Sequence, residues 1–65
     1  MEDLASDPDF DVGERLRALR SHVGLSQRRL ADLAQVPHGL ISMIETNRSS
    51  PSVSSLRKIL GGLGI

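Results

Sequence analysis

The chain is expected to fold as an all-α protein, a compact bundle of four helices. Only one of the 65 residues, Phe10, is aromatic, so the core must be built from Leu, Ile and Val, without the aromatic residues that strands favour. Apolar residues recur at the three- and four-residue spacing of amphipathic helices from about residue 12 onward. This length allows one small domain, near the lower limit for a core without disulfides or metals.

Composition excludes several classes of protein. There is no cysteine, and therefore no disulfide framework or thiolate metal site. No apolar run approaches the roughly 20 residues that span a bilayer, and the N-terminus is acidic, unlike a signal peptide. His22 and His38 lack clustered carboxylates, and neither a catalytic constellation nor a phosphate-binding glycine loop is present. We expect a cytoplasmic protein with no membrane partner, no enzymatic activity, no metal and no cofactor.

The formal net charge is zero, but the charges are unevenly distributed. Residues 1–11 hold five acidic residues and no Lys or Arg, whereas residues 12–65 hold all eight Lys and Arg against three acidic residues, a net charge of +5. Residues 1–10 lack periodicity, which predicts an acidic flexible tail, either an inert leader or a decoy that covers the basic face. The remaining domain, residues 11–65, is basic, as a phosphate-binding surface requires.

The first helix is expected to begin near Asp11, which has the spacing of a capping box with Glu14. Gly24 can end it in the left-handed conformation. Arg20 lies beside the apolar stripe, so its stem should be packed and its guanidinium needs a partner. The inward stripe itself is expected to comprise Val12, Leu16, Leu19 and Val23.

A second helix is expected after Ser26, a plain N-cap because the third residue after it is Arg29 and not Glu. Gln27 and Arg28 fall in its first turn, where backbone N–H groups can meet a phosphate. The residues expected to face the core or a crossing helix are Leu30, Ala31, Leu33 and Ala34.

A third helix is expected from about Pro37, a residue suited to a first turn, to Thr46, with Asn47 in the left-handed conformation that stops it. Val36 can fill the angle of the preceding turn. Ile41 and Ile44, three residues apart, should share the inward face.

Ser52 is expected to cap a fourth helix, the end of which is weakened by glycines at 61, 62 and 64. Its apolar stripe is expected to comprise Val53, Leu56, Ile59, Leu60 and Leu63.

Residues 26–45 therefore form two short helices joined by a tight turn, with the second displaying small and polar residues outward. This arrangement is a helix-turn-helix, the device that reads DNA in the major groove. The alternative is a helical packing motif without a DNA partner. The outward residues of the second helix are His38, Gly39, Ser42, Met43 and Thr46.

The segment GLSQRRLADLAQVPHGLISMIETNRSSPSVSSLRKI resembles the phage-repressor type of helix-turn-helix, the lambda-repressor-like family that includes the Cro repressors and the Xre-type regulators. The resemblance rests on Leu25-Ser26-Gln27, on Ala31 and Val36, and on Ile41-Ser42-x-Ile44-Glu45 followed by Pro51-Ser52. The stretch ISMIETNRSSPSVSSLRKIL is closest to bacterial regulators in which a small-molecule-binding cupin barrel follows.

The resemblance implies roles for matching positions. Gln27 should bond a phosphate and brace the recognition helix, while Arg20 and Glu45 should form a buried ion pair. The positions that face base edges are His38, Gly39, Ser42 and Met43. We expect phosphates to be held by Gln27, Arg28, Asn47, Arg48, Ser49 and Ser50.

Three departures from the family pattern affect these expectations. Gln35 replaces the usual turn glycine, which implies strain if the left-handed geometry is kept. Pro37 replaces the usual Ser or Thr cap. The base-facing set has no Arg, Asn or Gln: His38 can bond guanine, Ser42 almost any base, and Met43 only a thymine methyl. We therefore expect modest direct readout, supplemented by DNA shape.

The expected function is binding of a double-stranded DNA operator as the N-terminal domain of a bacterial transcriptional regulator, as a homodimer with half-sites about 34 Å apart. The rival is a protein-interaction module of the same fold. Family members usually add a fifth helix after a segment like residues 62–65, so we expect a fragment of a longer regulator. A small-molecule effector would then act only through a missing C-terminal domain.

Overall fold

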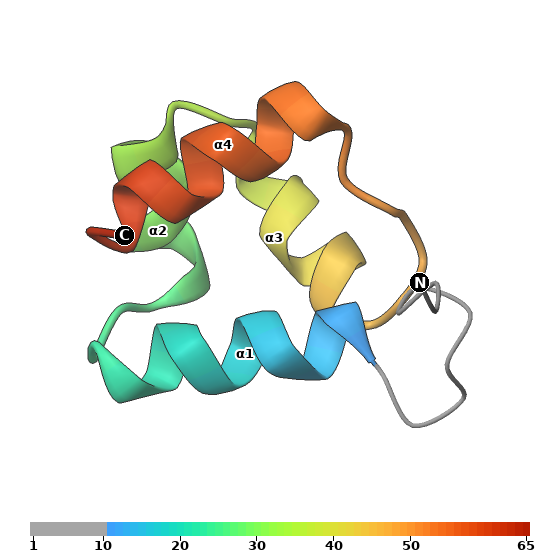
Figure 1. Ribbon diagram of the computed structural model, residues 1–65, viewed down its shortest axis with the longest axis horizontal. Helices are drawn as coiled ribbons and strands as arrows, with labels where there is room; N and C mark the ends of the chain where they lie inside the picture. The colour runs from blue at the N-terminus through green and yellow to red at the C-terminus, as the bar shows by residue number, and fades with distance from the viewer. Residues whose placement is uncertain (1–10) are drawn as a thin grey trace, which may run out of the picture.

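The computed structural model describes residues 11–65, which form four helices (Figure 1). These helices are α1 (Val12–His22), α2 (Gln27–Ala34), α3 (His38–Glu45) and α4 (Val53–Gly62). Short turns join α1 to α2 and α2 to α3, and a longer loop joins α3 to α4. The part of the chain that the structure describes contains no strand, which confirms the all-α prediction. The acidic tail predicted for residues 1–10 lies outside the described residues.

α3 occupies the middle of the bundle. α1 and α4 lie on opposite sides of it, and α2 lies beside it (Figure 1). The main contacts pair α2 with α4, α2 with α3, and α1 with α3. α3 is therefore held by two other helices, with one of its edges left to solvent.

Local hydrogen bonds explain where three of the helices begin. In each case the side chain of the N-cap residue accepts a backbone N–H from three residues further on, as predicted. The acceptor–donor pairs are Asp11 with Glu14 at 3.0 Å, Ser26 with Arg29 at 3.0 Å, and Ser52 with Ser55 at 3.1 Å.

The start of α3 has no such cap. Pro37 occupies the N-cap position, one residue before the first turn in which we predicted it, and provides no side-chain hydrogen bond. Its φ of −57° is nevertheless close to the value that the proline ring imposes, so the ring fixes the angle at which the chain enters α3.

Four helix ends share one geometry, the Schellman motif, in which a residue in the left-handed conformation closes the last turn. After α2 this residue is Gln35, with φ 58°; its N–H donates to the Asp32 carbonyl at 3.3 Å, and the Val36 N–H donates to the Ala31 carbonyl at 3.0 Å. The turn therefore keeps the left-handed geometry without glycine. The other left-handed residues are Gly24, Asn47 and Gly64.

The core lies where α2, α3 and α4 meet, with a contribution from α1. Val36 and the pair Ile41 and Ile44 are buried as predicted. The buried apolar residues are Leu16, Leu30, Ala31, Ala34, Val36, Ile41, Ile44, Ile59 and Leu63.

The prediction that Leu33 faces the core was wrong, because its side chain is 45% exposed. Successive residues of a helix are about 100° apart, so Leu30, Ala31 and Ala34 span one arc, and Leu33 lies about 100° from its middle. The two alanines allow α4 to pack closely on α2, and the position of α4 determines which arc of α2 is buried. Leu33 lies outside this buried arc.

The ends of two predicted apolar stripes are also exposed, contrary to prediction. In the first stripe these are Val12 and Val23, the residue that follows α1, and in the stripe of α4 they are Val53 and Leu56. Val12 and Leu56 are exposed because α1 and α4 do not pack closely on each other: an open apolar hollow of about 300 Å³ lies between them, with these two residues in its wall. The middle of each stripe, at Leu16 and Ile59, is buried.

Two glycines mark close approaches between helices. A Cβ on Gly13 would lie within 3.0 Å of the Ile44 and Glu45 carbonyl oxygens, so only glycine lets α1 pass this close to the end of α3. A Cβ on Gly62 would lie 3.0 Å from Leu30 Cδ1 and 3.2 Å from the backbone nitrogen of Ala34. The glycine-rich end of α4 therefore packs on α2.

Candidate nucleic-acid interface

Three polar side chains fix the C-terminal end of α3, and we call this cluster the brace: Arg20, Gln27 and Glu45. Arg20 Nε donates to Glu45 Oε2 at 2.6 Å, and Arg20 Nη2 donates to Glu45 Oε1 at 3.0 Å. Gln27 Nε2 donates to the same Oε1 at 3.1 Å. One carboxylate thus joins α1, α2 and α3.

The brace is inaccessible to water on its acidic side. The Glu45 side chain is 3% exposed and the Arg20 side chain 14%. Arg20 Nη1 also donates to the Leu25 carbonyl at 2.8 Å, and no buried side-chain nitrogen or oxygen within residues 11–65 lacks a hydrogen-bond partner. The partner that the sequence required for Arg20 is therefore Glu45, in the bidentate geometry that guanidinium favours.

The electrostatics of the brace favour the charged pair. Burial alone would raise the pKa of Glu45, but hydrogen bonds from Arg20 and Gln27, together with the charges of Arg20 and Arg17, outweigh burial and lower it. The hydrogen bond to Glu45 raises the pKa of Arg20 against the effect of burial. Both groups therefore stay ionised, and the end of α3 is held by charge as well as by packing.

Asn47 belongs to a second contact between α1 and the end of α3. Its Nδ2 donates to Asp11 Oδ2 at 3.2 Å. Hydrogen bonds from the Glu14 backbone N–H and the Asn47 amide lower the pKa of Asp11. We predicted that Asn47 binds a phosphate; the structure uses its amide within the protein, so a phosphate contact would have to compete with Asp11.

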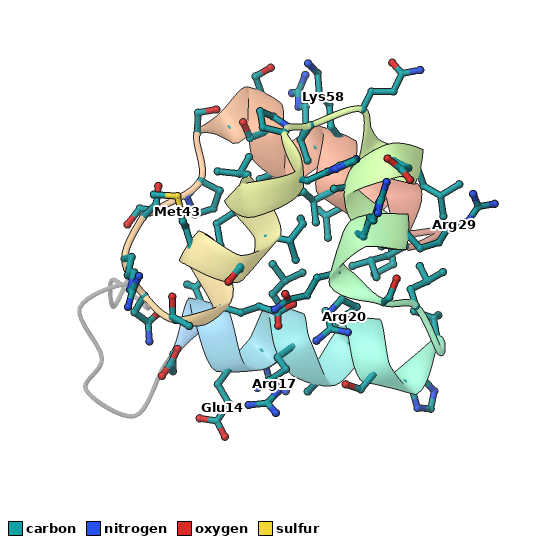
Figure 2. The ribbon with its side chains drawn as sticks, turned by 180° about the vertical axis from the view of Figure 1, so that it is seen from behind. Glu14, Arg17, Arg20, Arg29, Met43 and Lys58 are labelled. Atoms are coloured by element: carbon teal, nitrogen blue, oxygen red, sulfur yellow. The ribbon has the colours of Figure 1, made fainter. Side chains whose placement is uncertain are left out.

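The opposite edge of α3 is open, and we call it the reading edge: His38, Gly39, Ser42 and Met43. His38, Gly39 and Met43 are exposed, and Ser42 is half-buried. Met43 points away from α2 (Figure 2). A Cβ on Gly39 would meet no atom within 4 Å. All four predicted base-facing residues are therefore accessible, on a helix whose other edge is anchored in the core.

One contact at this edge was not foreseen from the sequence. The Nε2 of His38 lies 2.6 Å from Oδ1 of Asp32, which is on α2, and both side chains are about half exposed (55% and 47%). The two residues are six apart and face each other across the turn that Gln35 closes. The only sequence signal was a carboxylate and an imidazole on either side of a tight turn.

The predicted phosphate-binding residues flank the reading edge. Arg28 and Arg48 are exposed, and Ser49 is half-buried. Arg28 and Arg29 lie four and three residues before Asp32, so both border the side of α2 that carries Asp32. The side chains of Arg29 and Met43 point outward on opposite flanks of the molecule (Figure 2).

The two loops around α3 supply further contacts of the kind that DNA backbones receive. The Ser26 hydroxyl accepts only the Arg29 N–H, which leaves earlier N–H groups of the first turn of α2 directed out of the helix end. After α3, the N–H groups of Arg48 and Ser49 donate to the Met43 carbonyl at 2.8 and 3.2 Å. Because these backbone groups are occupied within the protein, the loop offers side chains for contacts with a DNA backbone. Ser50 is exposed beside them.

Within residues 11–65, no three side chains of the types that ligate metals gather closely enough to hold a metal ion. No helix of the described part is long and apolar enough to cross a lipid bilayer.

Comparisons with known proteins agree with a helix-turn-helix arrangement of α2 and α3. A family described as Helix-turn-helix matches residues 16–65. The chain is 43% identical over 60 residues to the HTH-type transcriptional regulator PuuR of Escherichia coli strain K12, covering 92% of the chain. It is 39% identical over 54 residues to the immunity repressor protein of Bacillus phage phi105, covering 83% of the chain, and 37% identical over 49 residues to repressor protein C of Escherichia phage P2, covering 75%.

These relatives are longer than the chain. The matched region spans 32% of PuuR, 38% of the phi105 repressor and 50% of the P2 repressor. No solved structure matches the chain with statistical significance.

Proposed function

Since the chain belongs to the helix-turn-helix family, we propose that it binds double-stranded DNA sequence-specifically as the DNA-binding part of a transcriptional regulator. In this proposal α3 enters the major groove with its reading edge toward the bases. Arg28, Arg48, Ser49 and the first turn of α2 hold phosphates on either side.

The observation that carries the proposal is the contrast between the two edges of α3. The brace fixes one end of the helix through a nearly buried carboxylate, while the reading edge stays accessible. A helix that is rigidly anchored and yet exposed along one edge can enter a groove without losing order. The packing-motif alternative gives no reason for the outward face to consist of His, Gly, Ser and Met.

Several finer statements belong to the same proposal. Two of the relatives are named repressors, which supports repression as the regulatory outcome. Binding as a homodimer on two half-sites about 34 Å apart, the arrangement usual for helix-turn-helix dimers, stays a prediction. A cytoplasmic location stays a prediction. A small-molecule effector acting through a further C-terminal domain stays a prediction.

DNA selection followed by titration tests the proposal. Sites selected from random duplexes by the 65-residue chain should share a sequence, and affinity for that sequence should fall steeply with salt, because phosphate contacts release counterions. Arg48→Ala and Arg28→Ala should weaken binding to all sequences alike and reduce the salt slope by about 1 each. His38→Ala and Ser42→Ala should instead alter the preferred sequence.

Arg29→Ala is the matched control, because Arg29 is also a first-turn arginine of α2 but points away from the flank that carries Met43 (Figure 2). It should leave the salt slope unchanged. The proposal fails if no sequence is enriched, or if Arg28→Ala and Arg48→Ala bind DNA as tightly as the unchanged chain. A tight complex with another protein and no DNA preference would support the interaction-module rival instead.

A further inference from the structure

We infer that Asp32 determines specificity: it takes the Nε2 proton of His38, so that Nδ1 is presented to DNA as a hydrogen-bond acceptor selecting an adenine or cytosine amino group. The inference rests on the proposed function, because it requires α3 to lie in the major groove. It starts from the 2.6 Å separation of His38 Nε2 and Asp32 Oδ1.

The chemistry of the pair dictates the polarity of the remaining nitrogen. An ionised carboxylate can only accept hydrogen bonds, so the proton between these two atoms belongs to Nε2. A neutral imidazole carries one N–H, and with that proton on Nε2 the Nδ1 atom is an acceptor. Asp32 therefore selects one of the two tautomers that an isolated histidine would sample.

The backbone keeps the two side chains facing each other. The Schellman turn at Gln35 reverses the chain after α2, and Val36, 9% exposed, anchors that turn in the core. Pro37 then sets the direction in which α3 begins. Asp32 is thus presented by a fixed turn and needs no induced movement to reach His38.

This polarity changes the expected base. In the major groove adenine N6 and cytosine N4 are amino donors, whereas guanine offers only acceptors at N7 and O6. An acceptor at Nδ1 matches the amino groups and is repelled by guanine. The sequence-based expectation that His38 bonds guanine would require a donor at that nitrogen.

The test compares the DNA sequences selected by three versions of the chain. All selections and titrations are made at pH 8. His38→Ala identifies the base pair that His38 reads, because preference should be lost at that pair. On the strand whose base His38 contacts, the unchanged chain should favour adenine or cytosine over guanine at this pair by about fivefold or more.

Asp32→Asn is the decisive variant, because it preserves size while allowing both tautomers: its carbonyl can accept from Nε2–H, and its amide can donate to a bare Nε2. It should reduce the preference at this pair to less than twofold and leave the other positions of the selected sequence unchanged. Nitrogen-detected spectra of the free chain should show protonated Nε2, with a mixture of tautomers in Asp32→Asn.

The outcomes separate the inference from the proposed function. If the unchanged chain enriches no sequence, the proposed function fails. If it enriches a sequence but selects guanine on the strand that His38 contacts, or if Asp32→Asn keeps the full preference there, only the role of Asp32 is overturned. If Asp32→Asn bound all DNA sequences more weakly by the same factor, with its sequence preference unchanged, the role of Asp32 would also be overturned, because loss of a merely structural contact has that effect.

Discussion

Two polar pairs of equal length hold opposite ends of α3. Arg20 and Glu45 meet at 2.6 Å at its C-terminal end, and His38 and Asp32 meet at 2.6 Å at its start. The side chains of the first pair are 14% and 3% exposed, whereas those of the second are 55% and 47% exposed. Distance alone therefore says little about what a pair does.

The difference separates stability from recognition. A buried carboxylate that loses its partner cannot regain water, so the brace cannot exchange its contacts without unfolding the end of α3. An exposed pair competes with water at all times and is worth little in stability. The pair at the start of α3 therefore contributes little to stability and stays accessible to a ligand, while the other end of the helix supplies the rigidity.

The largest effect should come from removing the buried carboxylate. Glu45→Ala leaves Arg20 with an uncompensated and mostly buried charge, a loss of about 3–5 kcal/mol in the free energy of unfolding. A small domain has only about 5–15 kcal/mol in total, so the variant should be close to unfolded. Urea denaturation followed by circular dichroism measures the change.

Asp32→Ala is the matched control at the other end of α3, since it removes the carboxylate of the exposed pair. It should cost less than about 1 kcal/mol. Equal losses from Glu45→Ala and Asp32→Ala would contradict the distinction between the two pairs.

Acid should weaken the brace without any mutation. Because the pKa of Glu45 in the folded state is lowered from its ordinary 4.5, the unfolded chain binds the proton first. The stability from this group is complete above pH 4.5 and declines as the pH falls below that value through the lowered pKa. Asp11 adds a decline in the same direction below its ordinary 3.8. Denaturation at successive pH values measures both.

Glu45→Gln should flatten this acid dependence, because glutamine does not titrate. The loss on acidification should be smaller than the loss in Glu45→Ala, since a protonated carboxyl can still accept hydrogen bonds. An unchanged acid profile in Glu45→Gln would show that the pair is not the source.

Two glycines extend the comparison to the backbone. Gly13→Ala should destabilise the chain by about 1–3 kcal/mol, because the added Cβ meets backbone carbonyl oxygens of α3 that cannot move aside. Gly39→Ala, at the open edge, should instead stabilise it by up to about 1 kcal/mol, since alanine favours the helix and meets no atom within 4 Å. Thermal unfolding gives the sign of each change in stability. Changes of the same sign would contradict the conclusion that Gly13 lies at a close helix contact and Gly39 at an open edge.

The sequence predicted those features in which the residues that interact lie close together along the chain. Caps at Asp11, Ser26 and Ser52 were recognisable because each signal and its hydrogen bond lie within four residues. The need of Arg20 for a partner followed from its position beside an apolar stripe, although the identity of Glu45 came only from the family resemblance.

The sequence could not predict contacts that depend on how helices approach each other. The role of Gly13 requires the end of α3 to lie above it, and the pairing of Asp32 with His38 requires the turn angle. Leu33 was misassigned for the same reason, because the position of α4 decides which arc of α2 is buried. Base contacts also depend on a partner, so they stay predictions.

The smallest effect concerns the two left-handed residues that flank α3. Gln35, with φ 58°, has a Cβ in a strained conformation, so Gln35→Gly should stabilise the chain by about 1 kcal/mol. Asn47 has nearly the same φ, 59°, but Asn tolerates this conformation well and its amide bonds Asp11. Asn47→Gly should therefore give no gain or a slight loss, measured by urea denaturation of both variants. A gain of equal size at both positions would mean that backbone strain alone decides these turns, and that the contact between Asn47 and Asp11 contributes nothing to holding α1 against α3.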